Sequence, residues 1–181
     1  MHRAILADAR LDGAFLSGAN LNLADLKRAS LLSADLRGAL LYGADLSLAH
    51  LGDANLSGAR LQNAKLGGAE LWRTNLSGVL ARGASFAGAD LREADLQLAN
   101  FQAANFQRSD LRGARLTNGG FMGVNFASAN LAQIHAFNAD FLAADFTDAR
   151  LVNADLRNVR LDGADLTCTQ FDNAVIGRVG T

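Results

Sequence analysis

Few residues of this 181-residue chain could do chemistry, and two groups stand out. His50 and Glu70 are 20 residues apart and would form an acid–base pair, or an ordinary surface ion pair, if the chain returned to the same place after 20 residues. Asp145, Asp148 and Asp165 form a group of carboxylates that could hold Ca²⁺, although solvated carboxylates are the ordinary case. Whether either group assembles depends on the elements that carry it.

Those elements are set by a period of five residues. From Leu6 to Ile176 in steps of five, 33 of 35 positions are Leu, Phe or Ile, and the exceptions are Ala81 and Ala136. We call this position the central residue of each unit; the residue two before it is Ala in 27 of the 35 units. A period of five scatters around a helix and alternates between the faces of a strand. The chain must therefore turn a corner every five residues.

The aromatic residues predict how many units make one coil. They form two series with a spacing of 20, namely Phe86, Phe106, Phe126 and Phe146, and Phe101, Phe121 and Phe141. Four units per coil would stack each series into a column at the strand spacing of about 4.8 Å. We therefore expect a four-sided coil of 20 residues, and the 35 units correspond to about 8.75 coils.

The remaining positions of the unit have their own preferences. Gly occupies 12 of the 35 positions two after the central residue, where a turn with positive φ would need it. Asp or Asn occupies 17 of the 35 positions just before the central residue, where a short polar side chain can bond the local backbone. Val79 accompanies the small Ala81, and Ile134 accompanies Ala136, which predicts that each pair refills lost core volume.

This pattern resembles the pentapeptide-repeat family, whose consensus is A(D/N)Lxx. The stretches Ala34-Asp35-Leu36-Arg37-Gly38 and Ala44-Asp45-Leu46 match it outright, and the resemblance covers residues 4–178. It implies an all-β fold, a right-handed quadrilateral parallel β-helix, and the handedness rests on the resemblance alone. We expect one domain over residues 1–181.

Composition and motifs exclude several functions. The net charge is −1, and no face is strongly acidic or basic, so nucleic acid is not an expected partner. No phosphate loop, nucleophile elbow or metalloprotease motif occurs, so we expect no catalytic residues, no cofactor, no metal site and no small-molecule substrate. Cys168 is the single cysteine, and no apolar run is long enough to cross a membrane, so we expect a cytoplasmic protein.

Residues 20 positions apart should meet on the surface. Trp72 and Arg92 are expected to form a cation–π contact. Asp25 faces Asp45, and Asp90 faces Asp110, so each like-charged pair needs a base nearby. The expected bases are Lys27, Arg28, Arg92 and Arg112.

Exposed large apolar residues indicate where a partner binds. The four faces of the coil begin with the units centred on Leu6, Leu11, Leu16 and Leu21, and each continues with every fourth unit. The fourth face carries the least charge. The predicted partner surface comprises Leu23, Leu40, Tyr42, Leu80, Met122 and Leu142 on the fourth face, and Phe137 on the adjoining third face.

The ends of the rod are a second candidate for contact, because a terminal coil exposes its core and its unpaired strand edges. We expect end-to-end association through the coil that contains Phe171 and Ile176. The partner is thus an unidentified protein or a second copy, with a homodimer formed by an end or a face.

Two functions follow from these observations. The first is a non-enzymatic protein–protein interaction or scaffold module that acts through outward residues. The alternative, brought by the resemblance, is a DNA mimic that binds a type II topoisomerase (gyrase) and protects it from quinolones. The family members with that role look acidic, dimerise through an appended C-terminal helix and often carry loops that interrupt the coils. This chain has a net charge of −1 and shows neither the helix nor the loops.

Overall fold

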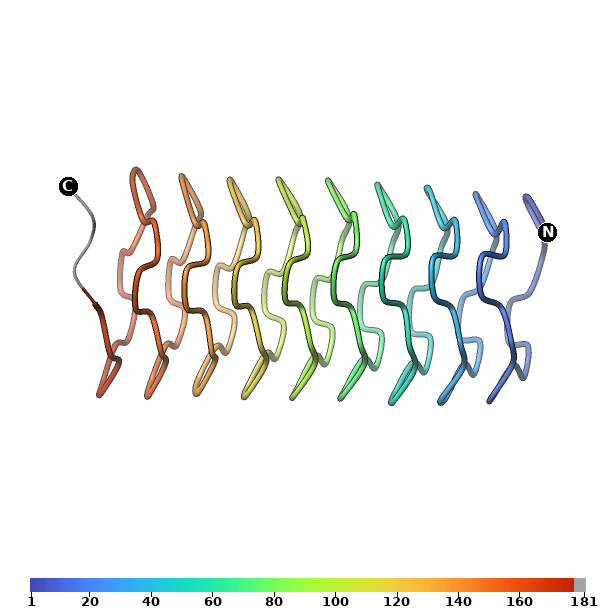
Figure 1. The fold of residues 1–181 in the computed structure, drawn as a ribbon, viewed down its shortest axis with the longest axis horizontal. Helices are drawn as coiled ribbons and strands as arrows, with labels where there is room; N and C mark the ends of the chain where they lie inside the picture. The colour runs from blue at the N-terminus through green and yellow to red at the C-terminus, as the bar shows by residue number, and fades with distance from the viewer. Residues whose placement is uncertain (178–181) are drawn as a thin grey trace.

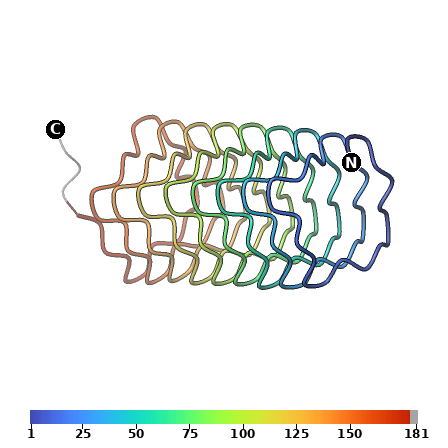
Figure 2. The same ribbon diagram turned by 45° about the vertical axis from the view of Figure 1, so that its right-hand side comes forward.

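A computed structural model describes residues 1–177 as a rod in which the chain winds around one axis, with the first and last described coils at opposite ends of the rod (Figure 1, Figure 2). Within this range the chain forms no helix, and each strand element is a single bridged residue. Parallel bridges recur at every fifth residue from Ile5 to Val175, and each joins residues 20 positions apart. The fold is a β-solenoid. Arg178, in the last expected repeat, lies outside the described residues.

Backbone hydrogen bonds hold each unit in two ways. One bond closes the corner within the chain, as when the Ala29 N–H donates to the Leu26 carbonyl at 3.0 Å. The others join coils through backbone carbonyl oxygens. The Leu26 N–H donates to the Asp45 carbonyl at 2.7 Å, the Arg28 N–H to the Ser47 carbonyl at 3.0 Å, and the Asp45 N–H to the Ala24 carbonyl at 2.9 Å. Four of the five N–H groups of a unit are satisfied in this way. In the described units, the N–H of the residue after the central one has no backbone carbonyl as its acceptor.

The Asp and Asn residues before the central position supply that missing acceptor. All 17 of them accept a hydrogen bond at 2.8–3.2 Å from the N–H two residues further on, as Asn105 does from Gln107. The prediction that these side chains support the corners is confirmed. It also explains the residue type, because a short side-chain oxygen reaches this N–H and longer side chains are less suited.

Two units without Asp or Asn borrow the acceptor from the neighbouring coil. The Leu32 N–H donates to the Asp12 carboxylate at 3.0 Å, and the Tyr42 N–H donates to the Asn22 amide oxygen at 2.8 Å. Ser30 and Leu40 stand where the usual acceptor would be. In these two units the donor is satisfied although the repeat departs from its pattern.

The corner itself requires a left-handed backbone conformation. Every fifth residue from Arg3 to Asn173 has positive φ, between 53° and 70°, as the third residue of a type II turn does. The 12 glycines predicted to serve this conformation all have it, so that prediction is confirmed. The other 23 positions hold non-glycine residues, whose Cβ atoms make this left-handed conformation sterically unfavourable.

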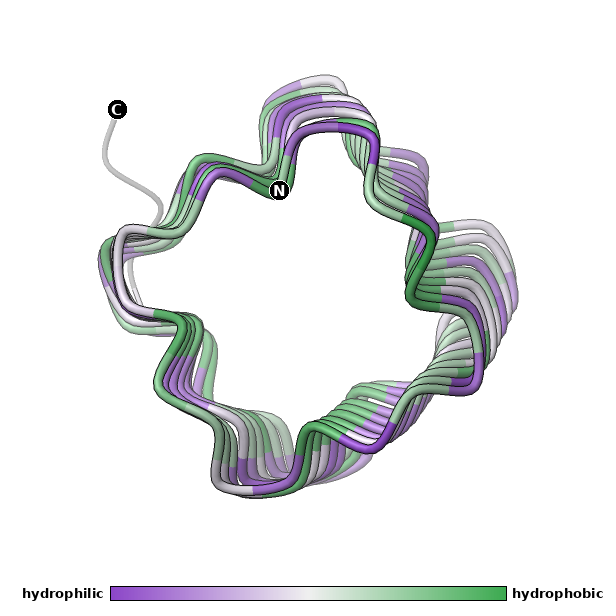
Figure 3. Ribbon diagram, turned by 90° about the vertical axis from the view of Figure 1, so that its right-hand side faces the viewer, coloured by the Kyte–Doolittle hydropathy of each residue, from purple (hydrophilic) through white to green (hydrophobic). Residues whose placement is uncertain are grey.

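The core lies inside the coils. Figure 3 looks along the rod and shows the outline that the stacked coils share, coloured by hydropathy. The central residues and their small partners from Leu21 to Val159 are 0–3% exposed. Five pairs of phenylalanines one coil apart are stacked, with ring centroids 4.7–5.4 Å apart. The predicted aromatic columns are therefore present.

Alanine suits the small inward position because it leaves the corner tight. The corner hydrogen bond is 3.0 Å long at Ala84, but it lengthens to 3.3 Å at Val79 and 3.4 Å at Ile134. Both larger residues are fully buried beside Ala81 and Ala136, as the volume exchange predicts. A β-branched residue at this position thus fills the core but lengthens the hydrogen bond that closes the corner.

We expect the left-handed corners to control stability. Gly88→Ala should lower the free energy of unfolding by about 1 kcal/mol, although its new Cβ meets nothing within 4 Å, because φ is +66°. Ala103→Gly, at φ 56°, should raise it by a similar amount. Urea denaturation measures both. Gly67→Ala is the matched control, since Gly67 is outside the positive-φ set; equal loss in both Gly→Ala variants would contradict this account.

The side-chain acceptors should be measurable separately. Asn105→Ala leaves the Gln107 N–H without its 2.9 Å partner and should cost about 1 kcal/mol of unfolding free energy. Asn105→Asp keeps the acceptor and should retain most of the stability. Ser85→Ala changes the same position one coil away, where Ser85 accepts no such bond, and should be nearly neutral. A similar loss in all three variants would show that the bond is not the cause.

Candidate partner-binding surface

The His50–Glu70 pair forms as expected. Their bridged positions bring His50 Nδ1 to 2.9 Å from the Glu70 carboxylate. Both side chains are about half exposed, at 45% and 50%, which is the setting of a surface ion pair. His135 likewise lies between Arg115 and Asp155 in a bridged column, on an open face.

Asp145, Asp148 and Asp165 are not arranged as a cation site. Within residues 1–177 no group of three or more His, Cys, Asp or Glu residues is placed to hold a metal ion. Asp145 and Asp165 are bridged, but each turns one oxygen to a local N–H, that of Thr147 or Thr167, at 2.9 Å. Their carboxylates are oriented by the corners, and Asp148 does not join them.

The cation–π contact of Trp72 is made by a different arginine from the one predicted. The Arg73 guanidinium lies 4.6 Å from the Trp72 ring centroid, whereas Arg92 binds the Asp90 carboxylate at 2.6 Å. The indole also covers Gly52, where an added Cβ would lie 2.3 Å from the ring. In the sequence, the signal for the packing of the indole over the neighbouring coil was Gly52, which lies 20 residues before Trp72.

Nine of the 18 acidic residues lie within 4.0 Å of an arginine nitrogen. Within single units, four Arg–Asp pairs lie two residues apart with nitrogen–oxygen distances of 2.6–2.7 Å. Hydrogen bonds from Arg37, Arg92 and Arg157 hold the pKa values of Asp35, Asp90 and Asp155, respectively, below their usual value.

The bases expected beside the bridged aspartates are present with one exception. Lys27 lies 4.0 Å from Asp25 and 3.4 Å from Asp45, so it serves both. Arg92 and Arg112 each hold the aspartate of their own unit. Arg28, however, turns to Asp8 at 2.7 Å, because the two side chains occupy the same corner column one coil apart.

The predicted partner surface has three clearly exposed members on the fourth face. Leu23, Tyr42 and Leu80 are 42%, 51% and 42% exposed. Leu40, Met122 and Leu142 are only half-buried, and Phe137 on the third face is 46% exposed. The apolar residues are not continuous, since Arg60 lies between Leu40 and Leu80 in their bridged column.

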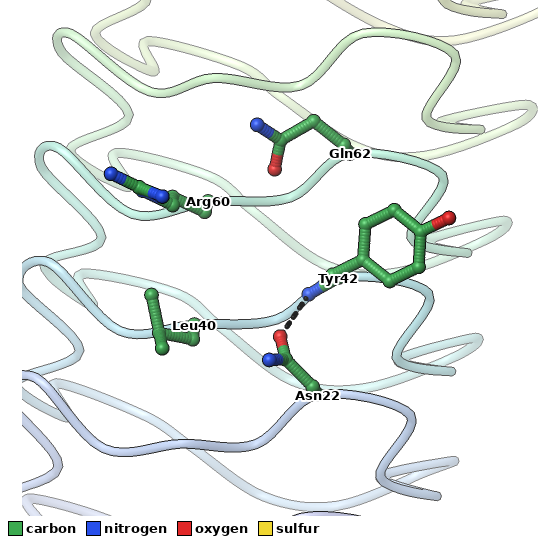
Figure 4. A pocket seen from close by; sticks show the side chains of 5 residues that line it. All are labelled: Asn22, Leu40, Tyr42, Arg60 and Gln62. Carbon is green, nitrogen blue, oxygen red and sulfur yellow. Dashed lines mark hydrogen bonds between the residues drawn. The ribbon is translucent and has the colours of Figure 1, made fainter.

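A shallow groove lies within this face. It has a volume of about 290 Å³ and is lined by Asn22, Leu40, Tyr42, Arg60 and Gln62 (Figure 4). Leu40 and Arg60 form one side, one coil apart, while the other three residues form the opposite side. The groove therefore runs along the rod, across successive coils.

Other exposed apolar residues were not anticipated. Leu98 is 69% exposed and has positive φ, at a corner of the third face, and Leu48 is 54% exposed at a corner of the first. Ile5 and Phe15 in the first coil are 86% and 91% exposed. The signal was present in the sequence, since all four are large apolar residues at outward positions of the unit.

At the C-terminal coil, Phe171 is half-buried and Ile176 is 50% exposed, and the end-to-end contact stays a prediction.

The arginine-bound aspartates predict how stability responds to acid. Their pKa values are lower in the folded state than the usual 3.8, so they stabilise the fold above the unfolded-state value. That contribution is lost as the pH falls through the folded-state pKa. Replacing all three, Asp35→Asn, Asp90→Asn and Asp155→Asn, keeps each amide-oxygen acceptor but removes the charge. Between about pH 5 and pH 2 the variant's unfolding free energy should fall less steeply than that of the native protein. Identical slopes would contradict the assignment.

Comparisons with known proteins agree with this architecture. The family described as Pentapeptide repeats matches with eight copies, over residues 4–43, 44–80, 82–118 and 139–176. The solved structure of HetL, a pentapeptide-repeat protein involved in heterocyst differentiation regulation from the cyanobacterium Nostoc sp. strain PCC 7120, is 31% identical; the match covers 95% of this chain and 76% of HetL, with a TM-score of 0.62.

A trypsin-treated form of QnrB1, a plasmid-mediated fluoroquinolone resistance protein, is 19% identical over 97% of this chain and 87% of its own, with a TM-score of 0.60. At that identity the likeness concerns the fold alone.

No curated protein matched the sequence. No helix in residues 1–177 has the length and apolar character needed to cross a membrane. The repeats, the bridged coils and these matches together establish that the chain belongs to the pentapeptide-repeat family and forms its right-handed β-solenoid.

Proposed function

We propose that the protein is a non-enzymatic interaction or scaffold module that binds a protein partner, or a second copy, through the fourth face. The observation that carries this proposal is the composition of that face. From Asn20 to Gly123 its outward positions hold Leu, Tyr, Met, Arg, Ala, Gly and amide residues and no Asp or Glu. Interface cores are enriched in aromatic residues, Met and Arg and depleted in acidic residues.

The interior supports a role without a small-molecule substrate. Leu and Phe side chains fill the coils, and the two buried polar residues bond the backbone: Thr74 donates to Leu51 at 2.7 Å and Ser109 to Phe106 at 2.6 Å. No buried side-chain polar atom among the described residues lacks a partner. Binding chemistry is thus left to the outer surface.

The likeness to HetL also favours this function. HetL is described as involved in the regulation of heterocyst differentiation, and a regulator that works by binding needs a surface of this kind. We further propose the four-sided coil with about 8.75 coils in all; the bridges between residues 20 apart and the stacked phenylalanines support it. The cytoplasmic location is part of the same proposal.

The charge arrangement gives less support to the alternative, a gyrase-binding DNA mimic. A mimic needs an uncompensated row of negative charge. Here Asp35, Asp90, Asp110 and Asp155 each hold an arginine of their own unit. A gyrase supercoiling assay with and without a quinolone would detect such a role.

The fourth-face proposal is tested by a photo-crosslinking residue at position 42 and, in a separate variant, at position 48 on the first face. In cells of the source organism, position 42 should capture a protein that position 48 does not. The purified partner should then bind Tyr42→Ser/Leu80→Ser at least about tenfold more weakly, since both side chains are exposed anchors. Leu48→Ser should leave the affinity unchanged.

The contradicting result is specific. Unchanged affinity in the Tyr42→Ser/Leu80→Ser variant, or an equal loss in Leu48→Ser, would remove the fourth face from the proposal. Circular dichroism of each variant excludes unfolding as the cause. Sedimentation of the free protein shows whether the captured partner is a second copy.

A further inference from the structure

We propose that the partner presents an acidic, partly apolar peptide segment to the fourth face, with its carboxylates against Arg60 and Arg82 and an apolar side chain in the groove beside Leu40 and Tyr42. This inference rests on the proposed function and adds the chemistry of the partner.

The first support is the state of the two arginines. Eight other arginines of the described chain hold a carboxylate within 4.0 Å, namely Arg28, Arg37, Arg73, Arg92, Arg112, Arg115, Arg157 and Arg160. Arg60 and Arg82 are exposed, and neither has an ion-pair partner within the described residues. Their guanidinium groups remain available for a carboxylate from outside.

The surroundings of these arginines favour an acidic ligand over a basic or neutral one. The fourth face carries no Asp or Glu between Asn20 and Gly123, so nothing on it competes for the two guanidinium groups. Arg60 and Leu80 are bridged, which places Arg82, two residues after Leu80, one coil beyond Arg60. Two positive charges on successive coils match a short acidic segment, whereas a nucleic-acid backbone calls for a longer basic stripe.

The groove supplies the apolar half of the site. Leu40 and Arg60 line one side, and Tyr42 and Gln62 line the other (Figure 4). Its volume of about 290 Å³ is just below the range for small-molecule pockets, and it is open along the rod, so it suits a side chain of a peptide better than a cofactor. An apolar residue next to an acidic one can fill it while the carboxylate reaches Arg60.

Most of the backbone around the groove is already bonded within the solenoid. The Leu40 N–H donates to Ala19 and the Arg60 N–H to Ala39, both at 2.9 Å, while the Tyr42 N–H donates to Asn22 at 2.8 Å. Strand addition to this face would require free main-chain groups. Among the five lining residues only the Gln62 N–H has no acceptor in the described chain, and one free donor cannot pair an added strand. Recognition here therefore comes mainly from side chains, and the charged ones are the two arginines.

A fluorescein-labelled ten-residue peptide of alternating Leu and Glu tests the inference against matched peptides with Gln or Lys in place of Glu. By fluorescence anisotropy the Glu peptide should bind at least about tenfold more tightly than the Gln peptide, and added salt should weaken it. Arg60→Gln/Arg82→Gln should lose about tenfold in affinity for the Glu peptide. Arg150→Gln is the matched control, because Arg150 is also exposed, in a bridged position on the second face, and has no ion-pair partner in the described chain.

Three results would overturn the acidic-partner inference: equal affinity for the Glu and Gln peptides, an equal loss in Arg150→Gln, or no binding by any peptide. The first result, together with loss of both peptides in Tyr42→Ser, would leave the fourth face as the binding surface and remove only the acidic character of its partner. Failure of the position-42 crosslink would instead count against the proposed function itself.

Discussion

The structure depends on the hydrogen bonds that join each coil to the next, 20 residues along the chain. A unit gives three of its N–H groups to neighbouring coils and one to its own corner, so one N–H is left over. The Asp or Asn before the central residue takes that last donor. This arrangement favours Asp or Asn at that outward position, which 17 of the 35 units have, and leaves the other outward positions freer.

The corner and the core set opposing demands on the same five residues. A tight corner favours Ala inward and Gly at the positive-φ position, whereas a filled core favours larger side chains inward. Val79 and Ile134 show the exchange, since each fills space beside an alanine and each lengthens its corner bond to 3.3 or 3.4 Å. The repeat thus keeps its phase through substitutions because the backbone bonds between coils stay at 2.6–3.2 Å.

Features tied to the backbone period could be predicted from the sequence, and features set by long side chains could not. The phenylalanine columns, the glycine corners and the His50–Glu70 contact all follow from the 20-residue return of the chain. Trp72, Arg28 and the aspartate group did not, because a flexible side chain can turn to its own unit or to either neighbouring coil. Arg28 turned to Asp8, and Arg92 to Asp90, so both choices occur. The same ambiguity limited the partner surface: Leu40, Met122 and Leu142 are less exposed than their outward positions indicated.

Function must be sought in the outward side chains, because nearly all backbone N–H and C=O groups of the coils are hydrogen-bonded within the solenoid. Along the sides of the rod, main-chain groups such as those of Leu40 and Arg60 are already bonded within the solenoid. On most of the surface the charged side chains are also paired with one another, which leaves little specific attraction for a ligand. The fourth face differs, since Arg60 and Arg82 lie among apolar and amide side chains with no acid nearby. A regular array therefore gains selectivity where its internal charge pairing stops, and the sign of the unpaired charge specifies the sign of the partner.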